Sequence, residues 1–184
     1  MVDGAIKLLP YHQTRLERTL AHCCPGTRSF SLSEVLADRP TSPGVVKIRV
    51  VYGAEGVTEV GYAPYAVRHI RRLQLVADDT IDYTYKSTDR SHLVALALQK
   101  DEADEVIIVK NGLLTDTSYS NIALYDGSGW FTPRLPLLRG TMRQYLLDQG
   151  RLREADIRPE DLAGFQKVAL INAMMPLGVC EVEF

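Results

Sequence analysis

The chain has 184 residues, of which 46% are hydrophobic and 24% charged, and its formal net charge at pH 7 is −2. This length and apolar content are enough to bury a sizeable core, so the composition excludes a disordered or collagen-like chain. The balance of charge argues against a nucleic-acid partner, and we interpret the short basic run at residues 68–72 as a solvated strand or turn edge. No stretch approaches the roughly 20 apolar residues of a membrane helix, so we expect no membrane partner.

Cysteine usage and the N-terminus narrow the class of protein further. The three cysteines form no Cys-x-x-Cys pair and the four histidines do not cluster with them, so neither a zinc site nor a disulfide framework is indicated. Residues 1–4 lack the basic and apolar regions of a signal peptide. We therefore expect a cytoplasmic protein with no metal site.

The first part of the chain predicts helices around a hairpin. Pro10 opens a helix over residues 11–23, and Ser31 and Glu34 fit a capping box for a second, short helix. The β-branched runs 45–51 and 57–62 flank a Gly-Ala-Glu-Gly turn, which is typical of a hairpin. We also predict strands at residues 2–9, interrupted by Asp3-Gly4, and at residues 66–76.

A linker at residues 77–79 is expected to divide a small N-terminal domain, residues 1–77, from a larger domain, residues 80–184. In the second part, Asn111-Gly112 signals a tight turn and Asp126-Gly127 a hairpin. We predict helices at 91–100 and 140–149, and strands at 105–110, 121–125, 130–132, 168–171 and 178–184. The predicted fold class is mixed α/β (α+β) with many antiparallel strands.

Two residues carry the chemistry that we infer. Lys86 ends the aromatic stretch Tyr83-Thr84-Tyr85, and Asp116 lies thirty residues later in the polar segment 115–118. A lysine amine and a lone carboxylate suit a cofactor that carries an aldehyde and a ring nitrogen. Without further evidence, a lysine of this kind is more often a solvated surface charge. A polar segment such as 115–118 is likewise more often an Asx-type turn between strands.

Three further motifs are candidates for binding a phosphate, one before Lys86 in the chain and two after Asp116. Arg15 lies in Tyr-His-Gln-Thr-Arg-Leu, on the first predicted helix, where an exposed arginine is also an ordinary occurrence. Gly140 precedes a predicted helix in Leu-Leu-Arg-Gly-Thr-Met-Arg, and Asn172 follows a buried strand. A helix that begins after a glycine presents backbone N–H groups, which bind phosphate.

Together, from Gly4 to about Pro176, these motifs resemble the fold-type IV pyridoxal-phosphate enzymes, the family of class IV aminotransferases and aminodeoxychorismate lyase. The resemblance implies a two-part fold with a small N-terminal α/β domain, a larger mixed domain and pyridoxal 5′-phosphate in the cleft between them. It also implies a homodimer that acts on a small-molecule amine or amino acid.

The resemblance assigns roles to individual residues. Lys86 would form the Schiff base, and Asp116 would pair with the pyridine nitrogen, where the branched-chain and D-amino acid enzymes more commonly have glutamate. Arg15, Gly140, Thr141 and Met142 would bind the phosphate, with Asn172 and Ala173 in a second phosphate turn. Tyr83, Tyr85, Ser118 and Tyr119 would lie near the cofactor or the substrate, although the two tyrosines equally fit packing in the core.

The leading functional hypothesis is an aminodeoxychorismate lyase, which eliminates pyruvate and gives 4-aminobenzoate. The alternatives are an amino acid aminotransferase of the branched-chain or D-amino acid type, and a cofactor-binding protein without turnover. The chain is shorter than most members and begins almost directly at the Asp-Gly of its first motif. A strand that usually precedes this motif is absent, which fits a misassigned gene start or a trimmed member with altered activity.

Overall fold

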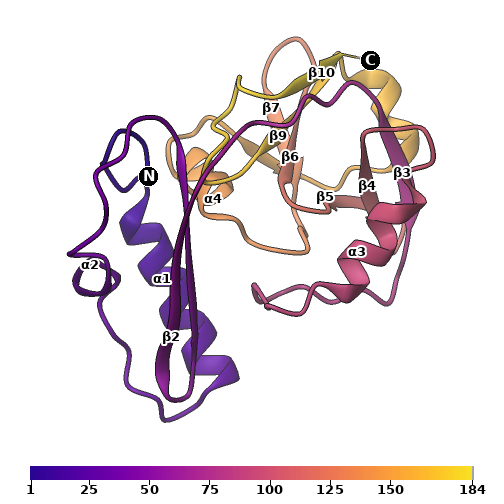
Figure 1. The fold of residues 1–184 in the computed structure, drawn as a ribbon. Coiled ribbons are helices and arrows are strands. Elements are labelled where there is room, and N and C mark those ends of the chain that lie inside the picture. Colours follow the sequence, from indigo (N-terminus) through magenta and orange to yellow (C-terminus); the bar gives the residue numbers. More distant parts are fainter. Residues whose placement is uncertain (184) are drawn as a thin grey trace. The chain divides into compact units, whose positions relative to one another are not determined.

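The chain divides into two compact units between Ala66 and Val67 in a computed structural model that describes residues 1–183 (Figure 1). Phe184, the last residue of the expected C-terminal strand, lies outside the described residues. Among residues 1–183, no helix combines the length and the apolar character that crossing a bilayer requires.

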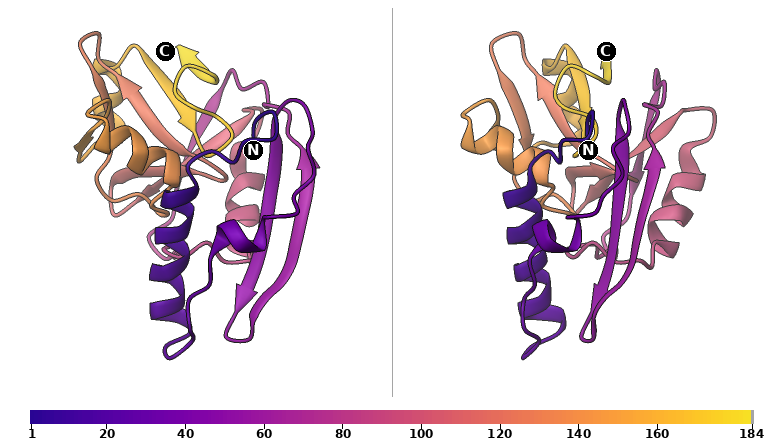
Figure 2. Two further views of the ribbon diagram at one scale, coloured as in Figure 1. Left: turned by 90° about the vertical axis from the view of Figure 1, so that its left-hand side faces the viewer. Right: turned by 60° about the vertical axis from the view of Figure 1, so that its left-hand side comes forward.

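The first unit pairs a long helix with a hairpin. Leu16 and Leu20 of helix α1 pack on Leu32, and Val50 and Tyr52 of the hairpin cover this cluster. Figure 2 shows α1 running alongside the hairpin. The predicted helices and hairpin are confirmed, with the bounds α1 (Leu9–Cys23), α2 (Leu32–Val35), β1 (Val46–Gly53) and β2 (Gly56–Pro64).

The strand predicted over residues 2–9 is wrong. Asp3 and Gly4 both have positive φ, 46° and 78°, and they turn the chain so that Val2 bridges to Ala5 as well as to Val45. A chain that reverses here cannot continue as a strand, and helix α1 already begins at Leu9.

The second unit is built on a mainly antiparallel sheet with the strand order β10-β9-β6-β5-β4-β3. Two pairs are parallel, β3 with β4 and β7 with β8. The strands are β3 (Leu73–Ala77), β4 (Glu105–Lys110), β5 (Leu113–Thr117), β6 (Asn121–Tyr125), β7 (Trp130–Pro133), β8 (Arg153–Ala155), β9 (Lys167–Ile171) and β10 (Glu181–Glu183). The helices are α3 (Ser91–Ala97), η1 (Leu98–Lys100), α4 (Thr141–Asp148) and η2 (Pro159–Gly164).

Most of the expected elements of this unit are confirmed. Asn111 and Gly112 have positive φ of 51° and 74°, as the tight turn between β4 and β5 requires. Strand β5 is a difference, because its polar residues Thr115–Thr117 were interpreted as a turn. These residues are buried and hydrogen-bonded inside the sheet, and a search for apolar residues does not detect such a strand.

The boundary between the units lies earlier than the expected linker at residues 77–79. Strand β3 begins only at Leu73 and pairs with β4, so this segment belongs to the second unit. The residues just before β3 do not pair as a strand with β4. The backbone N–H groups of Arg71 and Arg72 donate instead to the side chain of Asp104, at Oδ2, at 2.7 and 3.0 Å. The strand predicted over residues 66–76 is therefore limited to its last part.

Candidate functional site

The sheet register aligns three segments that carry polar residues. Asp116 at the end of β5 lies opposite Asn121 of β6, and Asn121 lies opposite Ile171 of β9. Asn172 follows Ile171 directly, at the start of the turn between β9 and β10. The register therefore brings the predicted acid and one predicted phosphate-binding turn to the same end of neighbouring strands in the sheet.

The carboxyl group of Asp116 is buried and held on both sides. Its residue is 4% exposed, and it accepts hydrogen bonds from Asn121 Nδ2 at 2.7 Å and from the backbone N–H of Leu138 at 2.8 Å. Burial raises the pKa of the Asp116 carboxyl to about 7, against the opposing effect of these hydrogen bonds and of the nearby Arg143 charge. Because burial disfavours the ionised form of this carboxyl group, a cation or an N–H donor beside it would stabilise the carboxylate.

Gly140 lies so close to Asn121 that no side chain fits. A Cβ atom at this position would stand 2.0 Å from Asn121 Oδ1. Asn121 cannot move away without cost, because its Nδ2 also donates to the carbonyl oxygen of Leu138 at 2.7 Å. Gly140 is the N-cap of α4 and caps it with no side chain, so the N–H groups of Thr141 and Met142 lack an intrahelical acceptor. Such a helix terminus is suited to an anion.

The turn after β9 uses Asn172 for its own closure. The Oδ1 atom of Asn172 accepts from the N–H groups of Met174 and Met175 at 2.9 and 3.1 Å, and its backbone N–H donates to the Met175 carbonyl. Within residues 1–183, the N–H of Ala173 donates to no other group. Asn172 therefore shapes the turn, and Ala173 is its available backbone donor.

Lys86 lies in an irregular loop, residues 81–90, which side chains hold in place. Ile81 is completely buried, and Lys110 Nζ donates to its carbonyl oxygen. The Tyr83 hydroxyl donates to the Ser87 carbonyl at 3.0 Å, across the residues that include Lys86. Tyr83 also packs against the core cluster around Ile81. Lys86 itself is exposed.

The lysine loop contacts the segment that follows the acid. Arg90, the last residue of the loop, donates from Nη2 to the carbonyl oxygen of Ser118 at 2.7 Å. Ser118 and Tyr119 belong to the turn between Asp116 and Asn121, where we predicted them near the cofactor. The structure thus joins the two segments that carry Lys86 and Asp116.

Arg15 belongs to the other unit, on α1, where its Nη2 lies 3.4 Å from His12 Nδ1. Its predicted role with the phosphate stays a prediction, as do the substrate roles of Tyr83, Tyr85, Ser118 and Tyr119. None of the sequence motifs pointed to Asn121, Leu138 or Arg143. An asparagine that follows the acid by one short turn was a usable signal for Asn121, whereas the backbone N–H of Leu138 leaves no trace in the sequence.

The groups of the second unit fit a phosphorylated pyridine aldehyde. The buried Asp116 carboxyl suits a ring nitrogen, the N–H groups at the start of α4 and at Ala173 suit a phosphate, and Lys86 is an accessible amine. No group of three or more histidine, cysteine, aspartate or glutamate side chains in residues 1–183 is placed to hold a metal ion.

Comparison with known proteins gives an independent result. A sequence model of the family described as amino-transferase class IV matches residues 1–182. An uncharacterised protein of Haemophilus influenzae is 36% identical over 175 residues, which cover 94% of this chain and 93% of the relative. A crystal structure named as a candidate 4-amino-4-deoxychorismate lyase from Haemophilus somnus has a TM-score of 0.90 and 34% identity, and the match covers 96% of this chain and 93% of that one.

A second solved structure shares the fold at lower identity. It is a hypothetical aminotransferase from Mycobacterium tuberculosis in its PLP-bound form, with a TM-score of 0.80 and 19% identity over 98% of this chain and 77% of that one.

Replacing Gly140 with alanine is expected to disturb Asn121 and, through it, Asp116. The φ of Gly140 is −70°, so the backbone tolerates alanine and the added methyl group alone causes the effect. We expect a loss of about 1–3 kcal/mol in the free energy of unfolding, measured by urea denaturation. Gly164→Ala is the control, because its Cβ would meet no atom within 4 Å. Equal stability of both variants would contradict the tight contact.

The stability of the cofactor-free protein is expected to fall as the pH rises from 5 to 8. With its pKa near 7, folded Asp116 keeps a proton that the unfolded chain loses near pH 4. The stabilising contribution of the neutral carboxyl is therefore complete below about pH 4 and is lost as the pH rises through 7. Between pH 5 and 8, the wild type should lose on the order of 2 kcal/mol more than Asp116→Asn in urea denaturation. Parallel pH profiles of the two proteins would refute the raised pKa.

Proposed function

Since this chain belongs to the class IV aminotransferase family, whose members are pyridoxal-phosphate-dependent enzymes, we propose that it is a lyase that converts 4-amino-4-deoxychorismate to 4-aminobenzoate and pyruvate. The structural observation that supports the proposal is the buried Asp116 carboxyl, set beside the N-terminus of α4 and the turn at Asn172. The choice of a lyase is supported by the 34% identical Haemophilus somnus structure with its lyase name.

We assign the binding of pyridoxal 5′-phosphate to groups of the second unit. Asp116 would hold the pyridine nitrogen, and a protonated nitrogen would in turn favour the ionised carboxylate, which burial alone disfavours. The N–H groups of Thr141, Met142 and Ala173 would donate to the phosphate. When bound, the cofactor supplies an electron sink for the pair of electrons left on the amine-bearing carbon.

The residues of the chain then handle the proton. The Lys86 amine would remove the proton from the amine-bearing carbon of the substrate. The electron pair left behind would complete the aromatic ring as the bond to the enolpyruvyl oxygen breaks, and the released enolpyruvate would take up a proton to become pyruvate. Asn121 and Leu138 fix the two oxygens of Asp116, so the carboxyl group would stay oriented toward the ring nitrogen.

The same residues suit an aminotransferase up to the loss of this proton. The two activities separate afterwards, because an aminotransferase returns the proton to the cofactor and passes the amine to a keto acid. The family assignment covers both activities, and the products therefore decide between them.

Purified protein with pyridoxal 5′-phosphate is expected to show a visible absorption band that Lys86→Ala lacks. Borohydride reduction and peptide mapping should place the label on Lys86, and the wild type should release pyruvate from 4-amino-4-deoxychorismate, measured with lactate dehydrogenase. Lys47→Ala is the control, because this exposed lysine lies on β1 in the first unit. Label on another lysine would overturn the site. Conversion to the pyridoxamine form with amino acids, without pyruvate release, would replace the lyase by an aminotransferase.

We further propose that the protein is a cytoplasmic homodimer, as is usual in the family. Light scattering coupled to size-exclusion chromatography should give twice the mass of the chain. A monomeric mass in the cofactor-loaded protein would exclude the dimer.

A further inference from the structure

The turn Thr117–Ser120 joins Asp116 to Asn121 and closes on itself. Thr117 Oγ1 accepts from the N–H groups of Ser120 and Tyr119 at 3.0 and 3.3 Å, and it lies 2.7 Å from Ser120 Oγ. Thr117 and Ser120 are 2% and 6% exposed. These bonds fix the inner side of the turn and leave the peptide groups of Ser118 to be held from outside.

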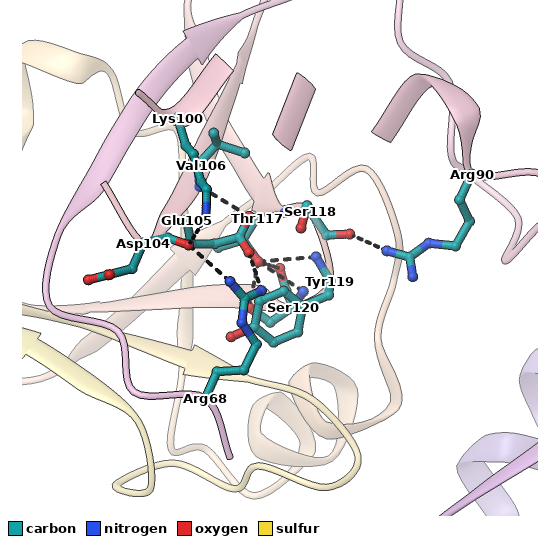
Figure 3. Close-up of polar contacts among 10 residues, drawn as sticks. All are labelled: Arg68, Arg90, Lys100, Asp104, Glu105, Val106, Thr117, Ser118, Tyr119 and Ser120. Carbon is teal, nitrogen blue, oxygen red and sulfur yellow. Dashed lines mark hydrogen bonds and ion pairs between the residues drawn. The ribbon is translucent and has the colours of Figure 1, made fainter. Parts of the chain in front are cut away.

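Ser118 is held from two directions, as Figure 3 shows. Its carbonyl oxygen accepts from Arg90 Nη2 at 2.7 Å, and its N–H donates to Glu105 Oε1 at 3.3 Å. Arg90 comes from the lysine loop and Glu105 from strand β4, so the turn lies between two parts of the chain that are distant in the sequence. Any displacement of Ser118 lengthens at least one of these bonds.

The Glu105 side of this arrangement is firmly built. Glu105 is 2% exposed, and its Oε1 also accepts from the N–H of Val106 at 3.1 Å. Its other oxygen pairs with Arg68 Nη1 at 2.8 Å, and the Arg68 guanidinium lies 5.1 Å from the centre of the Tyr119 ring (Figure 3). Arg68 therefore contacts both the carboxylate and the turn. We expected the basic run at residues 68–72 to be only a solvated edge. One of its residues, Arg68, instead has a role inside the fold.

The Arg90 side is different in character. Arg90 is exposed and lies in the same loop as Lys86, just before α3. Its carbonyl oxygen accepts a hydrogen bond from the backbone N–H of Val94, in the first turn of α3, at 2.9 Å. An exposed side chain with one hydrogen bond to a carbonyl adds little to the stability of the whole fold. Its effect is local, because it fixes how the lysine loop meets the turn after the acid.

We propose that Arg90 is a positioning residue that sets Lys86 in register with Asp116 by holding the Ser118 carbonyl. The inference rests on the proposed function for its kinetic consequence, and on the hydrogen-bond geometry alone for its structural one. Glu105, with Arg68 behind it, is the fixed support against which Arg90 acts. The guanidinium suits this task, because its planar donors are pre-organised and remain charged at every physiological pH.

The test compares Arg90→Ala and Arg90→Lys with wild type. Hydrogen–deuterium exchange is measured by mass spectrometry with and without pyridoxal 5′-phosphate, in the segment 117–121 and in β9 as an internal reference. The control variant is Arg134→Ala, which removes another exposed arginine with a single side-chain partner, Asp156 at 3.0 Å. Pyruvate release from 4-amino-4-deoxychorismate gives kcat and KM for each protein.

Arg90→Ala is expected to speed exchange in segment 117–121 at least about tenfold, with no change in β9, and to lower kcat at least about tenfold with KM within about threefold. Arg90→Lys should restore most of the protection, since its ammonium can still donate to the Ser118 carbonyl. Arg134→Ala should match the wild type in both measurements.

Unchanged exchange in segment 117–121 of Arg90→Ala would overturn the proposal, and so would faster exchange that extends to β9, because Arg90 would then act on overall stability. A wild type that releases no pyruvate would refute the proposed lyase instead. In that case the exchange pattern and the dissociation constant of pyridoxal 5′-phosphate, expected to rise at least about fivefold in Arg90→Ala, still decide the role of Arg90.

Discussion

The buried carboxyl of Asp116 is the constraint on which the rest of the site depends. Burying a carboxylate carries a large desolvation cost, which its hydrogen bonds offset only in part, and the raised pKa is the result. To provide those bonds, Asn121 must reach both the acid and the Leu138 carbonyl, and the start of α4 must approach so closely that position 140 accommodates glycine alone. The burial of this one carboxyl group therefore depends on the pairing of β5 with β6, on the path of the loop before α4 and on the glycine at position 140.

The two halves of the chemistry are supported differently. Asp116 lies on β5 and the turn at Asn172 follows β9, and both strands pair with β6, which fixes their spacing. Lys86 lies in a loop without regular structure, which depends on side chains such as Ile81, Lys110 and Tyr83. Under the proposed function, an acid fixed by the sheet and a lysine held separately would suit an enzyme whose lysine releases the cofactor and binds it again. The contact between Arg90 and Ser118 connects the two.

Several secondary-structure elements were predictable because their physical signals are local. Pro10, the Ser31 cap and the Asn111-Gly112 turn act within a few residues, and the structure has the corresponding elements where they were expected. Gly140 before a helix was visible as a motif for the same reason, whereas the asparagine that follows Asp116 was not selected. Strand β5 was missed because its buried face is polar, and residues 2–9 were misjudged because two positive φ angles reverse the chain.

The sequence by itself determined the family and the order of the segments that carry Lys86 and Asp116, because residue type and local conformation are encoded within short stretches. Only the tertiary structure decided which groups surround the carboxyl of Asp116, that Glu105 and Arg68 support the following turn, and that β3 belongs with the second unit. These features depend on contacts between segments far apart in the chain, and burial and hydrogen-bond geometry exist only once those segments meet.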